Sequence, residues 1–337
     1  MNITQKDIAR RLGISPSLVS RALRGTASDI GAAEETVERI RREAQRLGYR
    51  SSAAALTLRG EPTQTLGIVV KDFEDPYFGL LVGELQRVAS ATGFSLVLTG
   101  CVACRLDAGS LTKYRIDGLI IIGSEFEPQG LEPFFAAKMP VVQIGSGRTV
   151  PGLARVCMQQ AVGLGELLDY LGSLGHREVG YLGDGSPANA RRKTVLQQEM
   201  RRRGMTVRGK WFVHAAHAGP EAGAEAVARL LADGVDALPT AVVAADDVLA
   251  QSAMRALFER GCRVPHDVSL AGVDDIPSAR MMIPALTTVR QPMADMVQQA
   301  FALVTQGGPA LSGRMVDVVP DLVVRESCGA PAERRRP

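Results

Sequence analysis

A short polar stretch near the start of the chain carries side chains suited to hydrogen bonding with phosphates and base edges. Its hydroxyl and guanidinium groups belong to Ser15, Ser17, Ser20 and Arg21. The paired N–H groups of an arginine match the O6 and N7 acceptors of guanine, and serine hydroxyls can bond to phosphate oxygens. We expect Ser17 and Arg21 to contact base edges, and Ser15 and Ser20 to contact phosphates.

A second group of polar side chains follows short apolar runs in the rest of the chain. These groups are Asp75-Pro76-Tyr77-Phe78, Gly123-Ser124, Gly145-Ser146, Asp246-Asp247 and Asp274-Asp275. Ligands of open α/β sheets bind beyond the carboxyl ends of the strands. The candidate contacts for a small polar molecule are therefore Tyr77, Phe78, Ser124, Asp246 and Asp274. An aspartate after a strand also commonly caps the next helix, so each has a structural alternative.

The potentially reactive side chains form no recognisable catalytic or metal-binding motif. Cys101 and Cys104 have the spacing of half a zinc site, and His214 and His217 are close in sequence, but neither pair has further ligands at a suitable spacing. Nucleophile-elbow, Walker, dinucleotide-binding and His-Glu-x-x-His patterns are missing as well. We expect neither an enzyme nor a bound metal or cofactor, and we interpret the cysteines as ordinary thiols.

Capped helices position the polar stretch. Thr4 begins a helix that runs to about Leu12, with Asp7 placed to bond back to the cap, and Gly13 supplies the left-handed turn that ends it. Ser15 begins the next helix, whose apolar stripe consists of Val19, Ala22 and Leu23. Two helices joined by a glycine turn are typical of the helix-turn-helix, whose second helix enters the major groove of DNA.

The positive charge of the chain is concentrated at its start. Residues 1–60, which include a third predicted helix at 34–47, hold eleven lysines and arginines against six acids. Because the whole chain has a net charge of +3, these residues carry +5 and the other 277 carry −2. A basic segment on a nearly neutral body is typical of a DNA-binding module attached to another domain. We expect double-stranded DNA as a partner.

The remaining composition favours a globular protein. The chain has 337 residues, 46% of them hydrophobic, which is enough for two or three domains. No apolar run reaches the ~18 residues of a membrane span, and the charged N-terminus has no apolar signal core. We expect a cytoplasmic protein without membrane contact. A secreted or periplasmic binding protein would need a signal peptide and would have no basic helix-turn-helix.

From about residue 63 onward, short apolar runs alternate with amphipathic stretches. We predict strands at residues 66–70, 95–98, 118–122, 141–144, 179–182, 211–213, 241–244 and 270–273. We predict helices at residues 77–92, 165–174, 192–203, 221–232 and 248–260. This alternation indicates the α/β class, with parallel sheets covered by helices on both faces.

Several motifs of the chain resemble those of one known family. At the N-terminal end they are Asp7-Ile8-Ala9, Gly13-Ile14-Ser15, Val19-Ser20-Arg21 and Leu47-Gly48-Tyr49. Later motifs are Ala245-Asp246-Asp247, Arg263-Val264-Pro265-His266-Asp267, Gly272-Val273-Asp274-Asp275 and Val289-Arg290-Gln291-Pro292. By these motifs the chain resembles the lactose/galactose repressor (LacI/GalR) family from Ile3 to about Glu326. The function that this resemblance implies is sequence-specific repression of transcription.

The resemblance implies an all-α helix-turn-helix headpiece (1–50), a hinge helix and linker (51–62), and a two-lobed, periplasmic-binding-protein-like core with parallel sheets (63–327). Lobe 1 would hold residues 63–160 and 292–320, and lobe 2 residues 161–291 and 321–327. Residues 328–337 are expected to form a disordered tail. In the family, a hinge leucine wedges between base pairs when a homodimer binds a pseudo-palindromic operator, and Leu58 matches that leucine.

Within the core, the resemblance implies a small-molecule effector that modulates DNA affinity. Arg192 matches the family's effector-binding arginine by its spacing to Gly204, and Asp274 matches the aspartate that binds ligand hydroxyls. Three residues depart from the sugar-binding pattern, in which an acid or aromatic rings stand at these positions: Gly145, Ala218 and Met293. The effector is therefore expected to be a sugar or another small polar metabolite.

Overall fold

The structure is a computed structural model that describes residues 3–24, 27, 31–49, 62–101, 111, 113–123, 128–146, 150–216, 221–234, 237–306 and 313–332. The chain forms two compact units, Met1–Thr63 and Gln64–Pro337. In the described residues, no helix combines the length and the apolar character needed to cross a bilayer.

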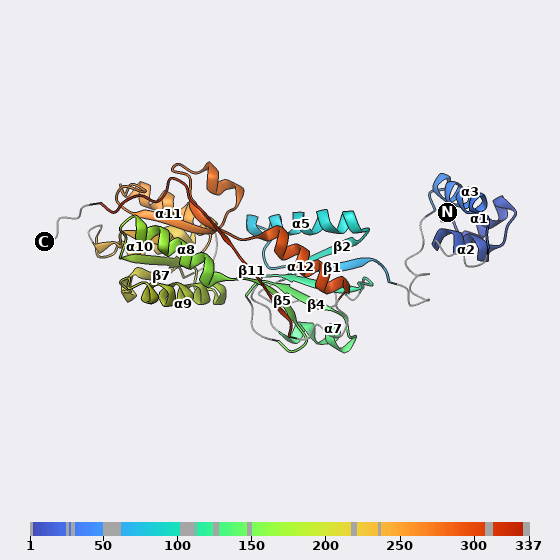
Figure 1. Cartoon of the computed structure of the whole chain (residues 1–337), viewed down its shortest axis with the longest axis horizontal. Coiled ribbons are helices and arrows are strands. Elements are labelled where there is room, and N and C mark those ends of the chain that lie inside the picture. Colours follow the sequence, from blue (N-terminus) through green and yellow to red (C-terminus); the bar gives the residue numbers. More distant parts are fainter. Residues whose placement is uncertain are drawn as a thin grey trace. The chain divides into compact units, whose positions relative to one another are not determined.

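The first unit is a small helical domain, drawn in blue in Figure 1. Its helices are α1 (Gln5–Leu12), α2 (Pro16–Arg24) and α3 (Glu34–Arg46). They bury a single core whose fully enclosed side chains include Ile8, Val19 and Ile40. The three side chains come one from each helix, so the core fixes the helices against one another.

The caps of these helices follow the sequence pattern. The backbone N–H and the hydroxyl of Thr4 both donate to the Asp7 carboxylate, at 2.9 and 2.6 Å. Gly13 ends α1 with a φ of +67°, which glycine adopts without strain. Ser15 caps α2, because its Oγ accepts a hydrogen bond from the Leu18 N–H at 3.2 Å. Helix α3 begins after Ala33, whose side chain offers no cap.

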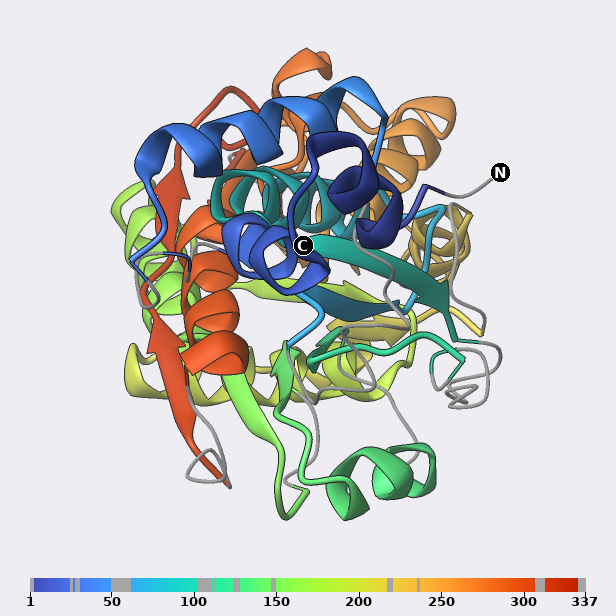
Figure 2. The same cartoon turned by 90° about the vertical axis from the view of Figure 1, so that its right-hand side faces the viewer.

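The second unit has two lobes, each built on a sheet. The first sheet has the strand order β11-β5-β4-β3-β1-β2, and every pairing in it is parallel. Its strands are β1 (Thr65–Val70), β2 (Ser95–Gly100), β3 (Gly118–Ile122), β4 (Val141–Ile144), β5 (Ala154–Met158) and β11 (Met315–Val318). Figure 2 shows β11 in red beside β5, at the sheet edge opposite the teal strand β2.

The second sheet has the order β12-β10-β9-β8-β6-β7. Its pairings are parallel except that of β10 with β12, which is antiparallel. The strands are β6 (Val179–Gly183), β7 (Phe212–His214), β8 (Ala241–Ala244), β9 (Ser269–Asp274), β10 (Thr287–Arg290) and β12 (Asp321–Val323). The predicted fold class, a helical headpiece with a two-lobed α/β core, is confirmed.

Helices cover the sheets because successive strand residues point to opposite faces. In β1, Ile68 and Val70 join the core under α5 (Pro76–Thr92) and α12 (Met293–Gln306), whereas Val69 faces the core that contains α7 (Glu132–Ala136). The second sheet shares one core with its own helices. These are α8 (Gln160–Ser173), α9 (Pro187–Arg202), α10 (Ala222–Leu230) and α11 (Asp247–Glu259).

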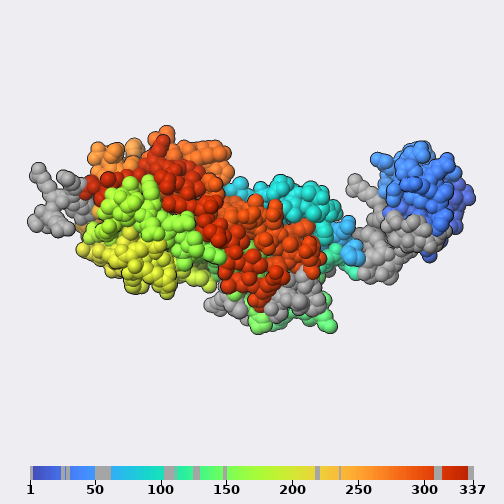
Figure 3. Space-filling model, in the orientation of Figure 1, coloured from blue at the N-terminus to red at the C-terminus, as the bar shows by residue number. Residues whose placement is uncertain are grey.

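The chain passes between the lobes at three places in its described part: between β5 and α8, between β10 and α12, and between β11 and β12. Figure 3 shows the last of these as a red band that runs from one lobe to the other. The crossings are tightly packed. A Cβ added to Gly163 of α8 would lie 2.5 Å from Val289 and 2.7 Å from Pro320.

The C-terminal segment differs from the prediction. Cys328 is buried, and its Sγ lies 3.4 Å from the Leu270 carbonyl oxygen. The Gly329 carbonyl oxygen accepts hydrogen bonds from Ser269 Oγ and from Nε2 of the buried His176, at 3.1 and 2.8 Å. The expectation of a disordered tail is therefore wrong for residues 328–332, and residues 333–337 lie outside the described part of the chain.

Candidate functional site

Helix α2 presents polar groups to solvent in the first unit. Ser15 and Ser17 are exposed, and Arg21 is half-buried one turn further along the helix. Ser20 is only 5% exposed, so its side chain lies on the buried side of α2, which does not favour the phosphate contact expected of it. The buried side of α2 is therefore wider than the predicted stripe of Val19, Ala22 and Leu23, and it includes the small side chain of Ser20. Leu58 lies outside the described residues.

The first unit also has exposed basic side chains, some of them in ion pairs. Arg46 and Arg11 share one carboxylate, that of Glu43, at 2.8 and 3.7 Å. Lys6 and Arg42 are exposed. Exposed cations that outnumber their acidic partners can neutralise phosphates, which makes binding to nucleic acid salt-dependent.

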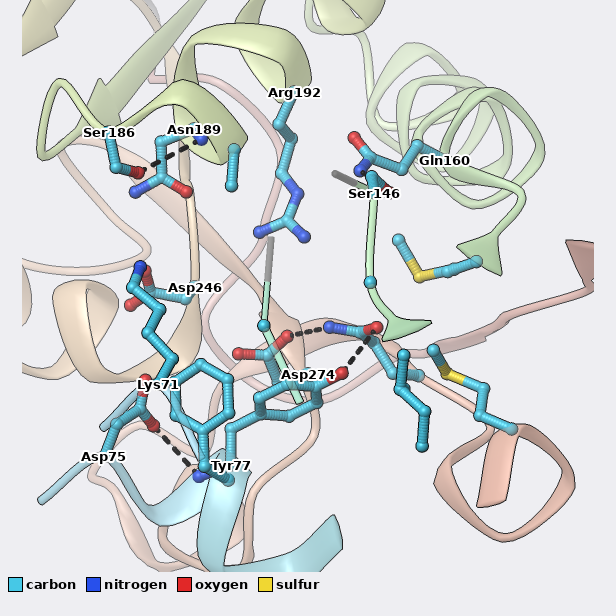
Figure 4. Close-up of a pocket in the computed structure, with 18 of the residues that line it drawn as sticks. Lys71, Asp75, Tyr77, Ser146, Gln160, Ser186, Asn189, Arg192, Asp246 and Asp274 are labelled. Carbon is cyan, nitrogen blue, oxygen red and sulfur yellow. Dashed lines mark hydrogen bonds between the residues drawn. The ribbon is translucent and has the colours of Figure 1, made fainter. Parts of the chain in front are cut away.

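The second unit contains a cavity of about 120 Å³ between its lobes. Its wall combines residues from the ends of first-lobe strands with residues of α9 and the second sheet. The polar and aromatic residues that line it include Lys71, Asp75, Tyr77, Phe78, Ser146, Gln160, Asp184, Asn189, Arg192, Asp246, Asp274 and Gln291. Figure 4 labels ten of the lining residues, and among them Tyr77 of the first lobe and Arg192 and Asp274 of the second point into one space. This position agrees with the rule that α/β proteins bind ligands beyond the carboxyl ends of their strands.

Arg192 extends from α9 toward the centre of the cavity (Figure 4). Helix α9 begins at Pro187 and is capped by Ser186, whose side chain accepts a hydrogen bond from the Asn189 N–H at 3.3 Å. Nη1 of Arg192 donates to the Ala245 carbonyl oxygen, at the end of β8. Its Nε is buried and has no hydrogen-bond partner among the residues that the structure describes. An unpaired buried N–H is costly, so a ligand acceptor at this point would be favourable.

A hydrogen-bond chain links the two lobes across the cavity. The Tyr77 hydroxyl donates to Gln291 Oε1 at 3.1 Å, and Gln291 Nε2 donates to Asp274 Oδ1 at 2.5 Å. Tyr77 belongs to α5 of the first lobe, Asp274 ends β9 of the second, and Gln291 lies in the crossing between β10 and α12. Asp274 also has a φ of +123°, an uncommon value for a residue with a side chain, which aims its carboxylate into the cavity.

Burial controls the titration of the cavity carboxylates. It raises the pKa of Asp274 well above the usual value, while the nearby Arg192 acts in the opposite direction. Burial also raises the pKa of Asp246, and that of Asp75 to about 6. Asp75 and Asp246 cap helices as well, because they accept the N–H groups of Tyr77 at 2.9 Å and of Leu249 at 2.7 Å. Asp75 and Asp246 can therefore each cap a helix and also contact a ligand in the cavity.

Two neighbouring aspartates have a structural role instead. Asp247 is fully buried and accepts hydrogen bonds from Thr288 Oγ1 at 2.6 Å and from the Ile276 N–H at 3.0 Å. Asp275 forms ion pairs with Arg290 and Arg325, at 2.7 and 2.5 Å. Both carboxylates thus bind groups within the second lobe and stabilise it.

The structure brings together five of the six predicted effector contacts around the cavity: Tyr77, Phe78, Arg192, Asp246 and Asp274. Ser124 lies outside the described residues, as does Ala218. Gly145 lines the cavity, whereas Met293 packs against the first-lobe core. Sequence reasoning did not select Lys71, Asp184, Asn189 or Gln160 as contacts. Lys71 directly follows β1, so its position in the sequence could have identified it.

The cysteines and histidines form no metal site in the described residues. Cys101, Cys157, Cys262 and Cys328 form no disulfide in the described part of the chain, and Cys104 and His217 lie outside it. His214 Nδ1 accepts the Gly185 N–H at 3.2 Å, which gives this histidine a structural role.

Comparisons with known proteins cover almost the whole chain. The periplasmic binding protein-like domain matches residues 168–328. The HTH-type transcriptional repressor PurR of Pectobacterium carotovorum is 30% identical over 334 residues, which cover 96% of each chain. PurR of Haemophilus influenzae is also 30% identical, over 96% of this chain and 98% of the relative.

Solved structures give the same picture. A LacI transcriptional regulator from a Rhodococcus species matches with a TM-score of 0.69 at 26% identity, over 80% of this chain and all of the other. The lac repressor dimer bound to operator and an anti-inducer matches with a TM-score of 0.82 at 24% identity, over 98% and 100% of the two chains, and supports the fold. These relatives are regulators of transcription and not enzymes. The chain belongs to the LacI/GalR family of transcription regulators.

Proposed function

We propose that this protein represses transcription by binding a pseudo-palindromic operator as a homodimer, and that a small molecule in the interlobe cavity modulates its affinity for DNA. The main support is that one chain contains both the capped helix α2, which has exposed polar groups, and a polar cavity lined by residues of two lobes. A repressor of this kind acts on chromosomal DNA, so we place it in the cytoplasm.

The polar face of α2 supports sequence-specific DNA binding. Ser15 and Ser17 are exposed at the start of the helix, and Arg21 follows one turn later. In helix-turn-helix proteins the N-terminal residues of the second helix contact base edges, and arginine prefers guanine. We assign base contacts to Ser17 and Arg21 and a phosphate contact to Ser15. Leu58 remains the proposed minor-groove wedge.

The cavity supports effector control because its walls belong to different lobes. A ligand that bonds to Arg192 and Asp274 in the second lobe also contacts Tyr77 in the first. Such a ligand favours one lobe arrangement over another. If the arrangement of the lobes alters the affinity for DNA, ligand and DNA affinities change each other by the same factor.

An exposed apolar patch on the second lobe supports the homodimer. Met281 and Ile283 are 69 and 94% exposed. Met281 and Ile283 border a shallow groove together with Met254 and Met282. Large apolar side chains gathered on one surface are typical of a contact with another protein surface. A second copy fits this role because two headpieces are needed to bind two operator half-sites.

The proposal is tested by selecting bound sequences from a random duplex pool with the full-length chain, then measuring affinity for the selected duplex. We expect a two-fold symmetric sequence. Arg21→Ala should cost about 1 to 3 kcal/mol on that sequence, the value of one base contact. The matched control is Arg42→Ala on α3, which should weaken selected and random duplexes equally. Failure to enrich any sequence would contradict the proposal.

A further inference from the structure

The interlobe cavity contains more negative than positive groups. Its titratable lining consists of the carboxylates of Asp75, Asp184, Asp246 and Asp274 and the cations Lys71 and Arg192. No other Lys, Arg, Asp, Glu or His lines it in the described part of the chain. If all of these groups are ionised, the acids exceed the bases by two. An uncharged or anionic ligand would leave this excess in place.

A second depression extends the acidic surface beside the first. It has a volume of about 320 Å³ and shares Lys71, Asp75, Phe78, Asp184 and Asp246 with the cavity. The residues that it adds include Asp72 and Glu74, both exposed, and no further cation within the described residues. A concave region dominated by one sign of charge raises the local concentration of ligands of the opposite sign.

The internal contacts leave hydrogen-bonding positions for such a ligand. Asp274 is 4% exposed, and within the described chain only its Oδ1 accepts a hydrogen bond, from Gln291. Asp75 likewise uses Oδ1 for the Tyr77 N–H. The second oxygens of Asp75 and Asp274 can each accept a hydrogen bond from a ligand. Within the described part of the chain, Arg192 Nε has no hydrogen-bond acceptor and Gln160 Oε1 has no donor.

We propose that the effector is a small organic cation, a primary amine that also carries hydroxyl groups, whose ammonium group bonds to Asp274 and is attracted by the surrounding carboxylates. This inference rests on the proposed function, because it names the ligand class of the same cavity. The hydroxyl groups accept from Arg192 and donate to Gln160. An ammonium group offers three donors, and its hydrogen bonds to a carboxylate are stronger than those of a neutral hydroxyl.

The test compares matched compounds that differ in charge. Binding to the full-length chain is measured by calorimetry for glucosamine, glucose and glucose 6-phosphate, and for 2-amino-1,3-propanediol, glycerol and glycerol 3-phosphate. We expect the amine to bind at least about tenfold more tightly than its neutral and anionic partners in one or both sets. Tighter binding of a neutral or anionic member, or no binding of either amine, would overturn the inference.

Variants and pH locate the interaction. Asp274→Asn keeps the shape of the side chain and should remove the preference for the amine, whereas Asp321→Asn, at an exposed position of β12, should retain it. The affinity for the protonated form of the amine should also weaken between about pH 7.5 and about pH 5. Burial raises the pKa of Asp75 to about 6 and also raises those of Asp246 and Asp274, so protonation of these carboxylates removes negative charge from the cavity. A preference unaffected by Asp274→Asn, or binding that strengthens as the pH falls, would contradict the assignment.

Operator binding measured in parallel separates the two proposals. If the chain binds its selected duplex and a neutral or anionic compound alters that binding, the proposed function holds and the amine inference fails. If amines bind but the chain shows no preference among duplexes, the proposed function fails and the ligand class stands.

Discussion

In the second lobe, the buried side chain of Asp247 packs directly against Gly272, and no space remains there for a Cβ atom on residue 272. A Cβ added to Gly272 of β9 would overlap Asp247 Oδ1 and lie 2.9 Å from Leu286 Cδ2. Asp247 is fully buried, and burial raises its pKa to about 7. Gly272→Ala must therefore displace the Asp247 carboxylate from its hydrogen bonds with Thr288 and the Ile276 N–H.

The expected cost follows from those two bonds. At about pH 8.5, where Asp247 is ionised, a hydrogen bond to its charged carboxylate contributes about 1.5 to 3 kcal/mol, so the loss of two destabilises the second lobe by about 3 to 6 kcal/mol. The free energy of unfolding of a typical protein is about 5 to 15 kcal/mol. With a urea m value of about 3 kcal/mol/M, the unfolding midpoint should fall by roughly 1 to 2 M.

The assay is urea unfolding followed by tryptophan fluorescence. Trp211 is the single tryptophan of the sequence and is buried in the same core as the second sheet, so its emission reports on this lobe. Gly209→Ala is the matched control, because a Cβ there meets nothing within 4 Å. Adding Thr288→Val to Gly272→Ala should cost little more, since the bond is already lost. A Gly272→Ala variant as stable as the Gly209→Ala control would refute this reasoning.

Three further predictions concern DNA binding, assembly and pH. Arg21→Ala should reduce the dependence of DNA affinity on sequence while leaving the thermal midpoint unchanged; a variant with the original operator preference would exclude the assigned base contact. Ile283→Asp should shift the sedimentation equilibrium toward monomer, whereas Val319→Asp, at another exposed apolar position, should not; a dimer unaffected by Ile283→Asp would place the interface elsewhere. The pKa of Asp75 is raised by burial from 3.8 to about 6, so the native state binds more protons and ionisation of Asp75 makes stability fall as pH rises through this range. Asp75→Asn should therefore have a higher thermal midpoint than the wild type at about pH 8 but not at about pH 4, and an equal difference at both values would contradict the role of burial.

Much of the fold could be predicted because its strongest patterns are local. The strand at residues 118–122 is a continuous apolar run, and the caps Thr4 and Ser15 are recognisable from residue type. The missed strands are β5, β10, β11 and β12. They contain polar residues such as Arg155, Thr288 and Asp317. Their positions are fixed by pairing with neighbours far along the chain, which a local pattern does not contain.

The candidate site was predictable where residues directly follow strands and less so elsewhere. Asp246 and Asp274 follow this rule, and so does Asp247, whose role is structural. Sequence alone cannot separate these aspartates, because the difference lies in Thr288, which occupies the hydrogen-bonding position beside Asp247 only in the folded lobe. Ser20 could not be placed from the sequence either, because a small polar residue next to the apolar stripe of an amphipathic helix can lie on its buried or on its exposed side.

The crossings around Gly163 have a consequence for protein engineering. Because β12 completes the second sheet after the chain has returned to the first lobe for α12 and β11, the second lobe is not one continuous segment. A chimera that takes this lobe from a relative must exchange two separate stretches of sequence together. The exchanged segments must also keep glycine at position 163 and its neighbours Val289 and Pro320. Otherwise the crossing segments cannot pack together and the two lobes of the chimera will not fit.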